Sequence, residues 1–499
     1  MTERRTPPDV PVEDLTEAIR QRDELLAIVS HDLRNPLSAI DLAASMLEDQ
    51  GPDPTTQKQL AIIRRATQRM EHLIRDLLDG KKVIPSSMGK EVDRVRAAVD
   101  LLQEGSVALV SSGDPNVYGM AGLGLEMAPR PAEVEVVPGV TSFTAAACLA
   151  GLAFRETVAA ISLSDLLTPW HDIEDRLRLS AEFEMPVALY NPRSKRRDWQ
   201  LIRALDLCGN RKVLVAKDVG REEQELFWTS SRELIENEAL REKIDMTTLV
   251  ILCGKGTFWG AAGSEAMMNV VGIGPGDRKH LTHEAESILK SSARIFGAQR
   301  YLEQISDISA AEKVNHPGPC PERMAARFRE AAALAKEGQK AAILTGGDPS
   351  IFSSGWRIVE QAQAALPAVP VHVSPGVSAF SSVAARAGAP LVNDFALLSE
   401  PGDPARVALL AAAGYAVVAY NVKGHEIASL LRDIDPARPC VLARDVARTG
   451  EEMMILTAED LMAANPGGFR FTLQVASANS CIKDGRIITK RGYQTKYSY

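Results

Sequence analysis

The chain has 499 residues, of which 45% are hydrophobic and 24% charged, with a formal net charge of −8 at pH 7. This length allows roughly two to four domains with packed cores. The acidic balance argues against a generalised nucleic-acid-binding surface, and no stretch approaches the roughly 20 apolar residues that cross a bilayer. Because the start lacks the apolar segment of a signal peptide, we expect a cytoplasmic protein.

The six cysteines are scattered without Cys-x-x-Cys spacing, so we expect reduced thiols and no metal site. Residues 1–11 are polar and proline-rich, which predicts a disordered lead-in. Between residues 12 and 78, apolar residues recur three and four apart in two seams separated by DQGPDP. This pattern indicates two amphipathic helices in an antiparallel hairpin. Because so thin a hairpin buries its seams only against a partner, we expect a homodimer.

The first helix of the hairpin carries SHDLRNPL at residues 30–37. This stretch resembles the phosphoacceptor motif in the dimerisation domain of sensor histidine kinases, and the resemblance covers residues 13–78. It implies that His31 accepts a phosphoryl group, since a neutral imidazole is nucleophilic near pH 7. No Asn-box or Gly-rich ATP lid follows, so a separate kinase would have to supply the phosphate. The alternative is a solvated histidine on a hairpin that only dimerises.

The rest of the chain carries one functional unit twice. VALVSSGDPNVY (107–118) and VEVVPGVTS (134–142) recur as AAILTGGDPSIF (341–352) and VHVSPGVSA (371–379). The separations are nearly constant, with 347 − 113 = 234 for the glycines before Asp-Pro and 420 − 190 = 230 for two tyrosines at predicted strand ends. Such spacing excludes chance. We call residues 79–256 copy 1 and residues 268–499 copy 2, with a Gly/Ala-rich linker at 257–267.

In copy 1 the pattern predicts a helix over 88–104, a strand at Val107–Val110, a helix, a strand at Val134–Val137 and a helix over 143–150. Strand, helix and strand with turn residues at the strand ends are typical of a parallel sheet. A second subdomain begins near residue 157, with further strands at 186–191, 213–218 and 247–253. We therefore predict an α/β fold of tandem two-domain units, preceded by the helical hairpin.

Copy 2 opens with VVGIGPGD, which has no counterpart in copy 1. The pattern is Gly272-x-Gly274-Pro275-Gly276 rather than Gly-x-Gly-x-x-Gly, and the proline removes an amide that a pyrophosphate cradle would use. Several Gly- and Pro-bearing turns remain at the carboxyl ends of predicted parallel strands, where α/β sheets place ligands. Asp114 and Asp348 lie in the tightest of these turns. Each is either a turn former or part of a ligand loop.

Together, GIGPGD, the two Gly-Asp-Pro turns, the PGVTS and PGVSA turns and the Tyr-Asn strand ends resemble the tetrapyrrole (corrin/porphyrin) methyltransferases. Copy 1 adds SLSDLLTPW (162–170) and LYNPRSKRRDWQ (189–200), and copy 2 adds NSCIKDGRIITKRGY (479–493). These stretches are similar to the precorrin-3B C17-methyltransferases of cobalamin biosynthesis. The resemblance implies transfer of a methyl group from S-adenosylmethionine to a carbon of a precorrin. A non-catalytic binder of cofactor or tetrapyrrole, with a dimerising or signalling hairpin, is the alternative.

The resemblance also implies site residues. The cofactor contacts in copy 2 are Pro275, Gly346, Gly347, Asp348, Ile351, Ser378, Ala379, Asn421 and Ala447. Those in copy 1 are Ser112, Gly113, Asp114, Val117, Thr141, Ser142, Asn191 and Gly220. The cations for substrate carboxylates are Arg193, Lys195 and Arg196, whose alternative role is a solvated helix start.

Each copy departs from the family pattern. Copy 1 lacks the opening strand and its Gly-Pro-Gly loop, so we expect its cofactor pocket to be open on one side. Copy 2 keeps that loop but has YNVKGH (420–425) where copy 1 has YNPRSK (190–195). Methyl transfer from a sulfonium requires no metal and no protein nucleophile, so we expect the fold to act by positioning the reactants and excluding water.

Overall fold

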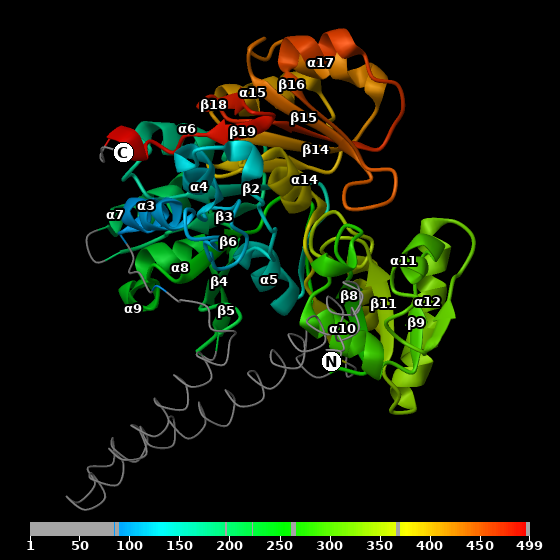
Figure 1. The fold of residues 1–499 in the computed structure, drawn as a ribbon. Coiled ribbons are helices and arrows are strands. Elements are labelled where there is room, and N and C mark those ends of the chain that lie inside the picture. Colours follow the sequence, from blue (N-terminus) through cyan, green and yellow to red (C-terminus); the bar gives the residue numbers. More distant parts are fainter. Residues whose placement is uncertain are drawn as a thin grey trace, which may run out of the picture. The chain divides into compact units, whose positions relative to one another are not determined.

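The computed structural model describes residues 84, 89–194, 197–221, 223–260, 266–365 and 370–495. It divides into two units, residues 1–88 and 89–499, and the second holds all of these residues except residue 84 (Figure 1). The predicted lead-in, the hairpin with His31, and Lys195 and Arg196 lie outside the described residues. Among the described helices, none is long and apolar enough to cross a membrane.

Copy 2 begins with a five-stranded parallel sheet in the order β10-β9-β11-β8-β12. Strand β8 (Met268–Gly272) pairs with β11 (Ala341–Thr345) on one side and with β12 (Val371–Ser374) on the other. Strand β9 (Arg294–Phe296) lies between β11 and β10 (Glu312–Val314). The helices of this half are α10 (His283–Ser291), α11 (Gln299–Gln304), α12 (Cys320–Lys336), α13 (Trp356–Ala365) and α14 (Ala379–Ala387). The predicted βαβ arrangement is therefore confirmed for copy 2.

Among the described residues, copy 1 has three α-helices in this half and no sheet. Helices α3 (Glu91–Leu101) and α4 (Ala121–Met127) share a small apolar cluster, and α5 (Ser142–Leu149) matches the helix predicted over 143–150. The predictions of strands at Val107–Val110 and Val134–Val137 are wrong, because the described residues there form no ladder. Val110 is 81% exposed, whereas its equivalent in copy 2, Leu344, is 2% exposed.

The order of the strands in copy 2 explains this difference. The equivalents of the two failed strands are β11 and β12, which do not pair with each other because β8 lies between them. Copy 1 has no counterpart of β8 in its sequence. In copy 1 the two segments would therefore need a strand between them, and the described residues contain none. Without such a partner for their main-chain groups, apolar composition alone does not make them a sheet.

The second halves of both copies form one ten-stranded sheet in the order β16-β15-β17-β14-β13-β2-β3-β6-β4-β5 (Figure 1). Its copy 1 strands are β2 (Thr157–Ser162), β3 (Val187–Tyr190), β4 (Lys212–Lys217), β5 (Glu225–Ser230) and β6 (Thr248–Leu252). Its copy 2 strands are β13 (Phe395–Leu398), β14 (Ala416–Val422), β15 (Pro439–Arg444), β16 (Glu452–Thr457) and β17 (Phe471–Val475). The strands predicted for the second half of copy 1 are thus confirmed.

Helices and short elements complete these halves. In copy 1 they are α6 (Trp170–Glu182), α7 (Trp199–Cys208), α8 (Ser231–Glu236) and α9 (Glu238–Glu242). In copy 2 they are α15 (Pro404–Ala412), α16 (Ile427–Leu431), α17 (Ala458–Ala464) and the hairpin of β18 (Ser480–Lys483) with β19 (Arg486–Thr489). Strand β1 (Leu152–Phe154) pairs with β7 (Thr257–Trp259), so part of the predicted linker is a strand.

The two copies meet where β2 and β13 pair antiparallel. Val158 pairs with Leu397, and Ala159 pairs with Ala396. Ala159 and Ala396 are equivalent, because they pair with Val187 and Val417, which are separated by 417 − 187 = 230 like the two tyrosines. The pair Ala159–Ala396 therefore joins equivalent residues, and exchanging the copies converts the pair Val158–Leu397 into the pair Ala160–Phe395. That reciprocity is the mark of an isologous two-fold contact, here formed within one chain. The copies therefore relate to each other as the two subunits of a dimer do.

A buried aromatic cluster lies at this junction. The rings of Phe143 and Phe380, which are equivalent residues of α5 and α14, have centroids 6.3 Å apart, and Phe395 lies 5.7 Å from Phe380. All three side chains are fully buried. Aromatic side chains bury roughly 150–250 Å² each, so this cluster makes separation of the copies costly.

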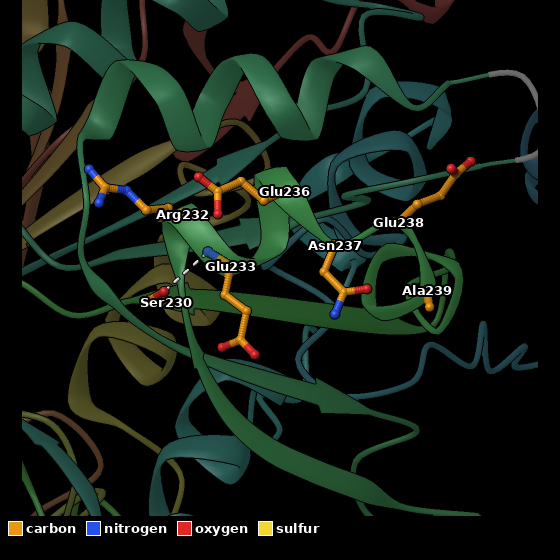
Figure 2. Close-up of a pocket in the computed structure, with 7 residues that line it drawn as sticks. All are labelled: Ser230, Arg232, Glu233, Glu236, Asn237, Glu238 and Ala239. Atoms are coloured by element: carbon orange, nitrogen blue, oxygen red, sulfur yellow. Dashed lines mark hydrogen bonds between the residues drawn. The ribbon is translucent and has the colours of Figure 1, made fainter.

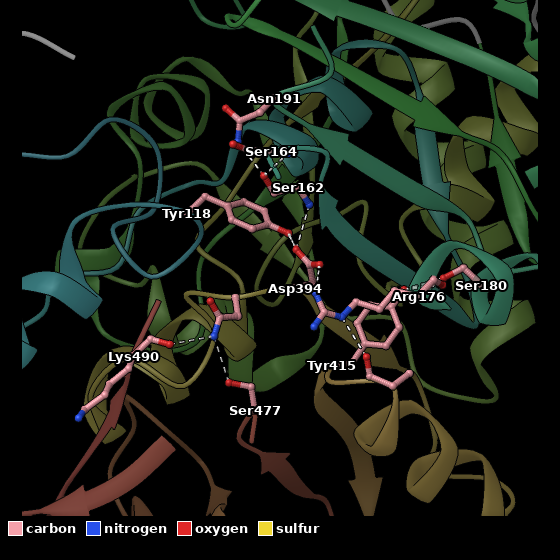
Figure 3. A network of polar contacts seen from close by, with 12 residues as sticks. Tyr118, Ser162, Ser164, Arg176, Ser180, Asn191, Asp394, Tyr415, Ser477 and Lys490 are labelled. Carbon is pink, nitrogen blue, oxygen red and sulfur yellow. Dashed lines mark hydrogen bonds and ion pairs between the residues drawn. The ribbon is translucent and has the colours of Figure 1, made fainter. Parts of the chain in front are cut away.

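A polar network also joins the copies (Figure 3). Asp394, at the start of β13, accepts hydrogen bonds from Tyr118 Oη at 2.8 Å and from Ser162 N at 2.9 Å, both of copy 1. Its other oxygen pairs with Arg176 Nη1 of α6 at 2.7 Å, and the two side chains are 6% and 11% exposed. A buried carboxylate with this many donors is satisfied only while both copies remain in place.

We predict that Arg176→Met destabilises the chain by about 3–5 kcal/mol, because it leaves the Asp394 charge buried without its counterion. The measurement is the free energy of unfolding in urea. Arg178→Met on the same helix is the matched control, since Arg178 is 56% exposed and pairs with Glu174 at the surface. Its cost should stay within about 1 kcal/mol. Equal effects of the two variants would contradict a role for the network in joining the copies.

Candidate functional site

Three turns of copy 2 meet at the carboxyl ends of neighbouring parallel strands. They follow β8 (residues 273–276), β11 (346–349) and β12 (375–378). Gly347 and Gly274 exchange main-chain hydrogen bonds of 2.8 and 3.3 Å. A Cβ at Gly376 would lie 2.3 Å from Gly347 O, and one at Gly272 would lie 2.8 Å from that same oxygen. Only glycine permits this approach, so the turns form one closely packed cradle.

The side chain of Asp348 fastens two of these turns together. One carboxylate oxygen accepts from Gly376 N at 3.1 Å, and the other accepts from Ser350 N at 2.8 Å and from Ser350 Oγ at 2.5 Å. Burial raises the pKa of this carboxyl, and the donors around it oppose that shift. Because the carboxylate is engaged and only 2% exposed, the loop can offer its backbone, rather than this side chain, to a ligand.

The first turn of α14 lies beside this cradle. The hydroxyl of Tyr420, at the end of β14, accepts a hydrogen bond from Phe380 N at 2.9 Å. Burial raises the pKa of this phenol, so the group stays neutral. Ser378 Oγ is buried with no hydrogen-bond partner among the described residues, and Ala379 N lies 3.7 Å from a Cβ placed on Gly347. The cradle thus keeps unused polar groups at the N-terminus of a helix.

Left-handed backbone conformations recur at equivalent positions of the two copies. The φ angles are +66° at Gly347 and +68° at Gly113, +55° at Asn421 and +50° at Asn191. Asn421 Nδ2 also donates to Ser399 O at 3.0 Å, which orients the strand end. Backbone strain that persists in both copies is typical of ligand-binding segments.

The second half of copy 2 closes one side of the cradle. In the turn after β15, Ala447 has φ +61°, and its carbonyl oxygen lies 2.4 Å from where a Cβ on Gly276 would be. Arg448 Nε donates to Pro275 O at 2.6 Å. The predicted residues Pro275, Gly346–Asp348, Ser378, Ala379 and Ala447 therefore belong to turns that meet, whereas Asn421 lies in β14 and Ile351 is buried in the core between the copies.

Copy 1 reproduces part of this arrangement. The Tyr190 hydroxyl lies 3.1 Å from Ser142 Oγ and 3.4 Å from Thr141 Oγ1, at the start of α5. Asn191 Nδ2 donates to Ser162 Oγ at 3.0 Å, and Asp114 Oδ1 accepts from Asn116 N at 3.0 Å. The predicted Ser112, Gly113, Gly220 and Val117 lie in the equivalent turns, with Val117 in the core. Copy 1 has no Gly-Pro-Gly loop in its sequence, and the open side of its cofactor pocket stays a prediction.

The predicted substrate cations are only partly described. Arg193 donates to Arg241 O at 2.9 Å and pairs with Asp198 at 2.9 Å, so its guanidinium already has partners. Lys195 and Arg196 lie outside the described residues. The role of these three residues in binding carboxylates stays a prediction.

A further hollow among the described residues lies elsewhere. It measures about 670 Å³ and is formed by α8 and α9 (Figure 2). Its lining residues are Ser230, Arg232, Glu233, Glu236, Asn237, Glu238 and Ala239. Ser230 and Asn237 accept hydrogen bonds from main-chain N–H groups and so serve as helix caps. None of the predicted site residues lies there, so we do not place the functional site in this hollow.

Sequence reasoning missed two residues beside the cradle. Arg448 holds Pro275, and Tyr301 of α11 lies so close to Gly346 that a Cβ there would be 2.7 Å from its hydroxyl. Arg448 could have been found, because Arg221 of copy 1 precedes it by 448 − 221 = 227 residues, the separation of Asp218 and Asp445. Tyr301 belongs to a helix that copy 1 lacks, so no repeat marked it.

Comparisons with known proteins agree with this geometry. Residues 56–235 and 267–462 match the family described as Tetrapyrrole (Corrin/Porphyrin) Methylases, and residues 21–82 match the His Kinase A (phospho-acceptor) domain. The fold and its paired glycine turns therefore define a methyltransferase. More particularly, the chain belongs to the tetrapyrrole (corrin/porphyrin) methylase family, of which it carries two copies.

The chain is also similar to individual proteins and to a solved structure. The chain is 41% identical over 196 residues to a probable cobalt-factor III C(17)-methyltransferase of Salmonella typhimurium, covering 38% of the chain and 79% of that protein. It is 26% identical over 421 residues to the cobalamin biosynthesis protein CobIJ of Mycobacterium bovis, covering 80% of the chain and 79% of that protein. The crystal structure of the methyltransferase CobJ aligns with 45% of this chain and 100% of its own, at 21% identity and a TM-score of 0.39.

We predict that Gly376→Ala destabilises the chain by about 2 kcal/mol or more, because the added Cβ meets Gly347 O and the turns must separate. Urea unfolding measures the loss, and amide hydrogen exchange at residues 346–349 shows whether the cradle opens. Gly467→Ala is the control, since nothing lies within 4 Å of its Cβ. A similar cost for both variants would show that the turns are not closely packed.

Proposed function

We propose that the chain methylates a carbon of a precorrin-type tetrapyrrole in cobalamin biosynthesis, with S-adenosylmethionine as methyl donor and copy 2 as the cofactor site. The observation that carries the proposal is the cradle of copy 2, in which loops from both halves of a family unit meet around Gly347. The reaction at C17 follows from relatives named as C(17)-methyltransferases. In copy 1, by contrast, the loop that would complete the cradle is missing.

The residues of copy 2 fit the cofactor. Gly346, Gly347 and Ala379 offer main-chain groups at a place where small residues let a flat ligand approach closely. Ser378 Oγ is a buried polar atom without a described partner, and a ligand would give it one. Pro275 and Ala447 border the cradle from the two halves, so a ligand held there would contact both.

The chain contributes by positioning rather than by covalent catalysis. S-adenosylmethionine supplies an electrophilic methyl group on a sulfonium when it is bound. The turns would hold the two reactants at attack distance, which can lower the barrier by roughly 7–11 kcal/mol. Because the positive charge of the sulfonium would be dispersed in the transition state, a cradle with few water contacts would favour the reaction, and the buried Asp348 and Ser378 indicate such a place.

We predict that one S-adenosylmethionine binds per chain and that Gly347→Arg abolishes this binding, since the new side chain would fill the cradle. Isothermal titration calorimetry measures stoichiometry and affinity. Gly113→Arg is the matched control, because Gly113 has a similar φ and lies at the equivalent position of copy 1. Unchanged binding by Gly347→Arg, or two cofactors per chain, would contradict the assignment to copy 2.

The same protein tests catalysis. Incubation with methyl-labelled S-adenosylmethionine and precorrin-3B or cobalt-factor III should transfer label to the ring, and the label should be absent with Gly347→Arg. Cofactor binding without label in either ring would instead support the non-catalytic alternative, in which the chain only binds its ligands.

The N-terminal segment has a second candidate function. Because residues 21–82 match a phospho-acceptor domain, we propose that His31 accepts a phosphoryl group from a separate histidine kinase. The neutral imidazole is a suitable nucleophile for that transfer. The bounds of the predicted helical hairpin, residues 12–78, and its dimerisation stay predictions.

We predict that a histidine kinase with radiolabelled ATP gives the chain an acid-labile phosphate that His31→Gln lacks. Acid treatment of the labelled protein before and after electrophoresis measures it. Binding of S-adenosylmethionine should be the same in both proteins, since His31 lies outside the methylase copies. Label that survives in His31→Gln would exclude His31 as the acceptor.

A further inference from the structure

We propose that copy 1 is a receptor for a polypeptide segment donated by a separate molecule. The segment is an apolar strand followed by a Gly-x-Gly-Pro-Gly loop, of the kind that copy 2 carries at residues 268–276. The inference concerns peptide binding by copy 1 and does not depend on methyl transfer by copy 2. It rests on three parts of copy 1. Their equivalents in copy 2 contact this segment, and the parts themselves are present in copy 1 although the segment is missing there.

The first part is the pair of turns that would flank the segment. A Cβ on Gly139 would lie 2.2 Å from Gly113 O, as one on Gly376 would lie 2.3 Å from Gly347 O. The φ angles of Gly113 and Gly347 are +68° and +66°. The turns of copy 1 thus keep the mutual approach that they have in copy 2, although the strand that ends between them is absent. A binding site that is already formed loses little entropy when it is filled.

The second part is the pair of strand edges. In copy 2, Gly347 N donates to Gly274 O at 2.8 Å, whereas Gly113 N has no hydrogen bond to any described residue. Val110 and Val137 are 81% and 65% exposed. In copy 2 the equivalent segments are β11 and β12, and β8 pairs in parallel with both. Unpaired main-chain groups beside exposed apolar side chains form a template for an added strand.

The third part is an arginine that lacks its target. The turn at 218–221 repeats the turn at 445–448: Gly220 N donates to Gln224 Oε1 at 2.8 Å, as Ala447 N donates to Glu451 Oε2 at 2.7 Å. In copy 2 this turn positions Arg448 so that its Nε donates a hydrogen bond to Pro275 O. In copy 1 the equivalent Arg221 is 61% exposed and lies 3.4 Å from Asp218 of its own turn. Its exposed guanidinium can donate a hydrogen bond to a carbonyl oxygen of a bound loop.

The occupant that we propose comes from another molecule. The sequence contains Gly-x-Gly-Pro-Gly once, at residues 272–276. The strand before it is already paired on both sides in copy 2, so it cannot serve copy 1 of the same chain without breaking the first sheet. Copy 2 also shows the size of the segment, which is a strand of five residues with the loop that follows it.

The test uses the full chain and a fluorescently labelled synthetic peptide of residues 266–298. Fluorescence anisotropy should show saturable binding of one peptide per chain. Hydrogen exchange should show new protection at residues 107–113 and 134–139 when the peptide is bound. The same peptide with Val270→Pro should not bind, because proline removes a ladder N–H group from the strand.

Paired variants of the chain identify the copy that binds. Arg221→Met should weaken peptide binding about tenfold, since it removes a charged hydrogen-bond donor. Arg448→Met should leave the affinity within twofold, because its turn belongs to copy 2. Equal losses in both variants would mean that the peptide exchanges with β8 of copy 2, and this would overturn the proposal.

Three other outcomes would also overturn it. One is the absence of saturable binding. Another is protection of residues 107–113 in the chain without peptide at every concentration, which would show that the chain's own residues cover this edge. The last is protection that grows with chain concentration alone, which would make a second whole copy of the chain the occupant.

Discussion

The pairing of β8 with two neighbours is the constraint on which the first half of a family unit depends. In copy 2 this strand joins β11 to β12 and brings the turns that follow all three strands to one edge. The cradle around Gly347 is a consequence of that arrangement, because glycines in adjacent turns approach to distances that no Cβ would allow. Copy 1 shows the converse. Three α-helices and the turns persist there, but among the described residues its would-be strands form no ladder.

The second constraint is the two-fold contact between the copies. Reciprocal pairing of β2 with β13 converts two sheets into one, and the fully buried rings of Phe143, Phe380 and Phe395 pack at that junction. The network around Asp394 adds polar groups that are satisfied only across the junction. Copy 1 thereby supports copy 2 even where its own first half is incomplete.

The two copies also serve as controls for each other. Arg448 and Arg221 occupy the same turn, yet only Arg448 has a Gly-Pro-Gly loop to bind. Likewise, the carboxylates of Asp348 and Asp114 are both buried in their turns, which explains the repeated Asp-Pro sequence by turn formation. What the loops present to a ligand is then mainly backbone. This is why the positions, rather than the side chains, of Gly347, Asn421 and Ala447 define the candidate site.

The sequence by itself determined the α/β class, the two copies and most strands of the second halves, because repeats, alternation and glycine turns can be recognised without tertiary contacts. It could not decide that Val107–Val110 would remain unpaired, since a strand depends on a neighbour that local composition does not report. Nor could it show that β2 and β13 join the copies, or that Tyr301 lies beside Gly346. Those contacts join residues that are distant along the chain, and only tertiary packing brings them together.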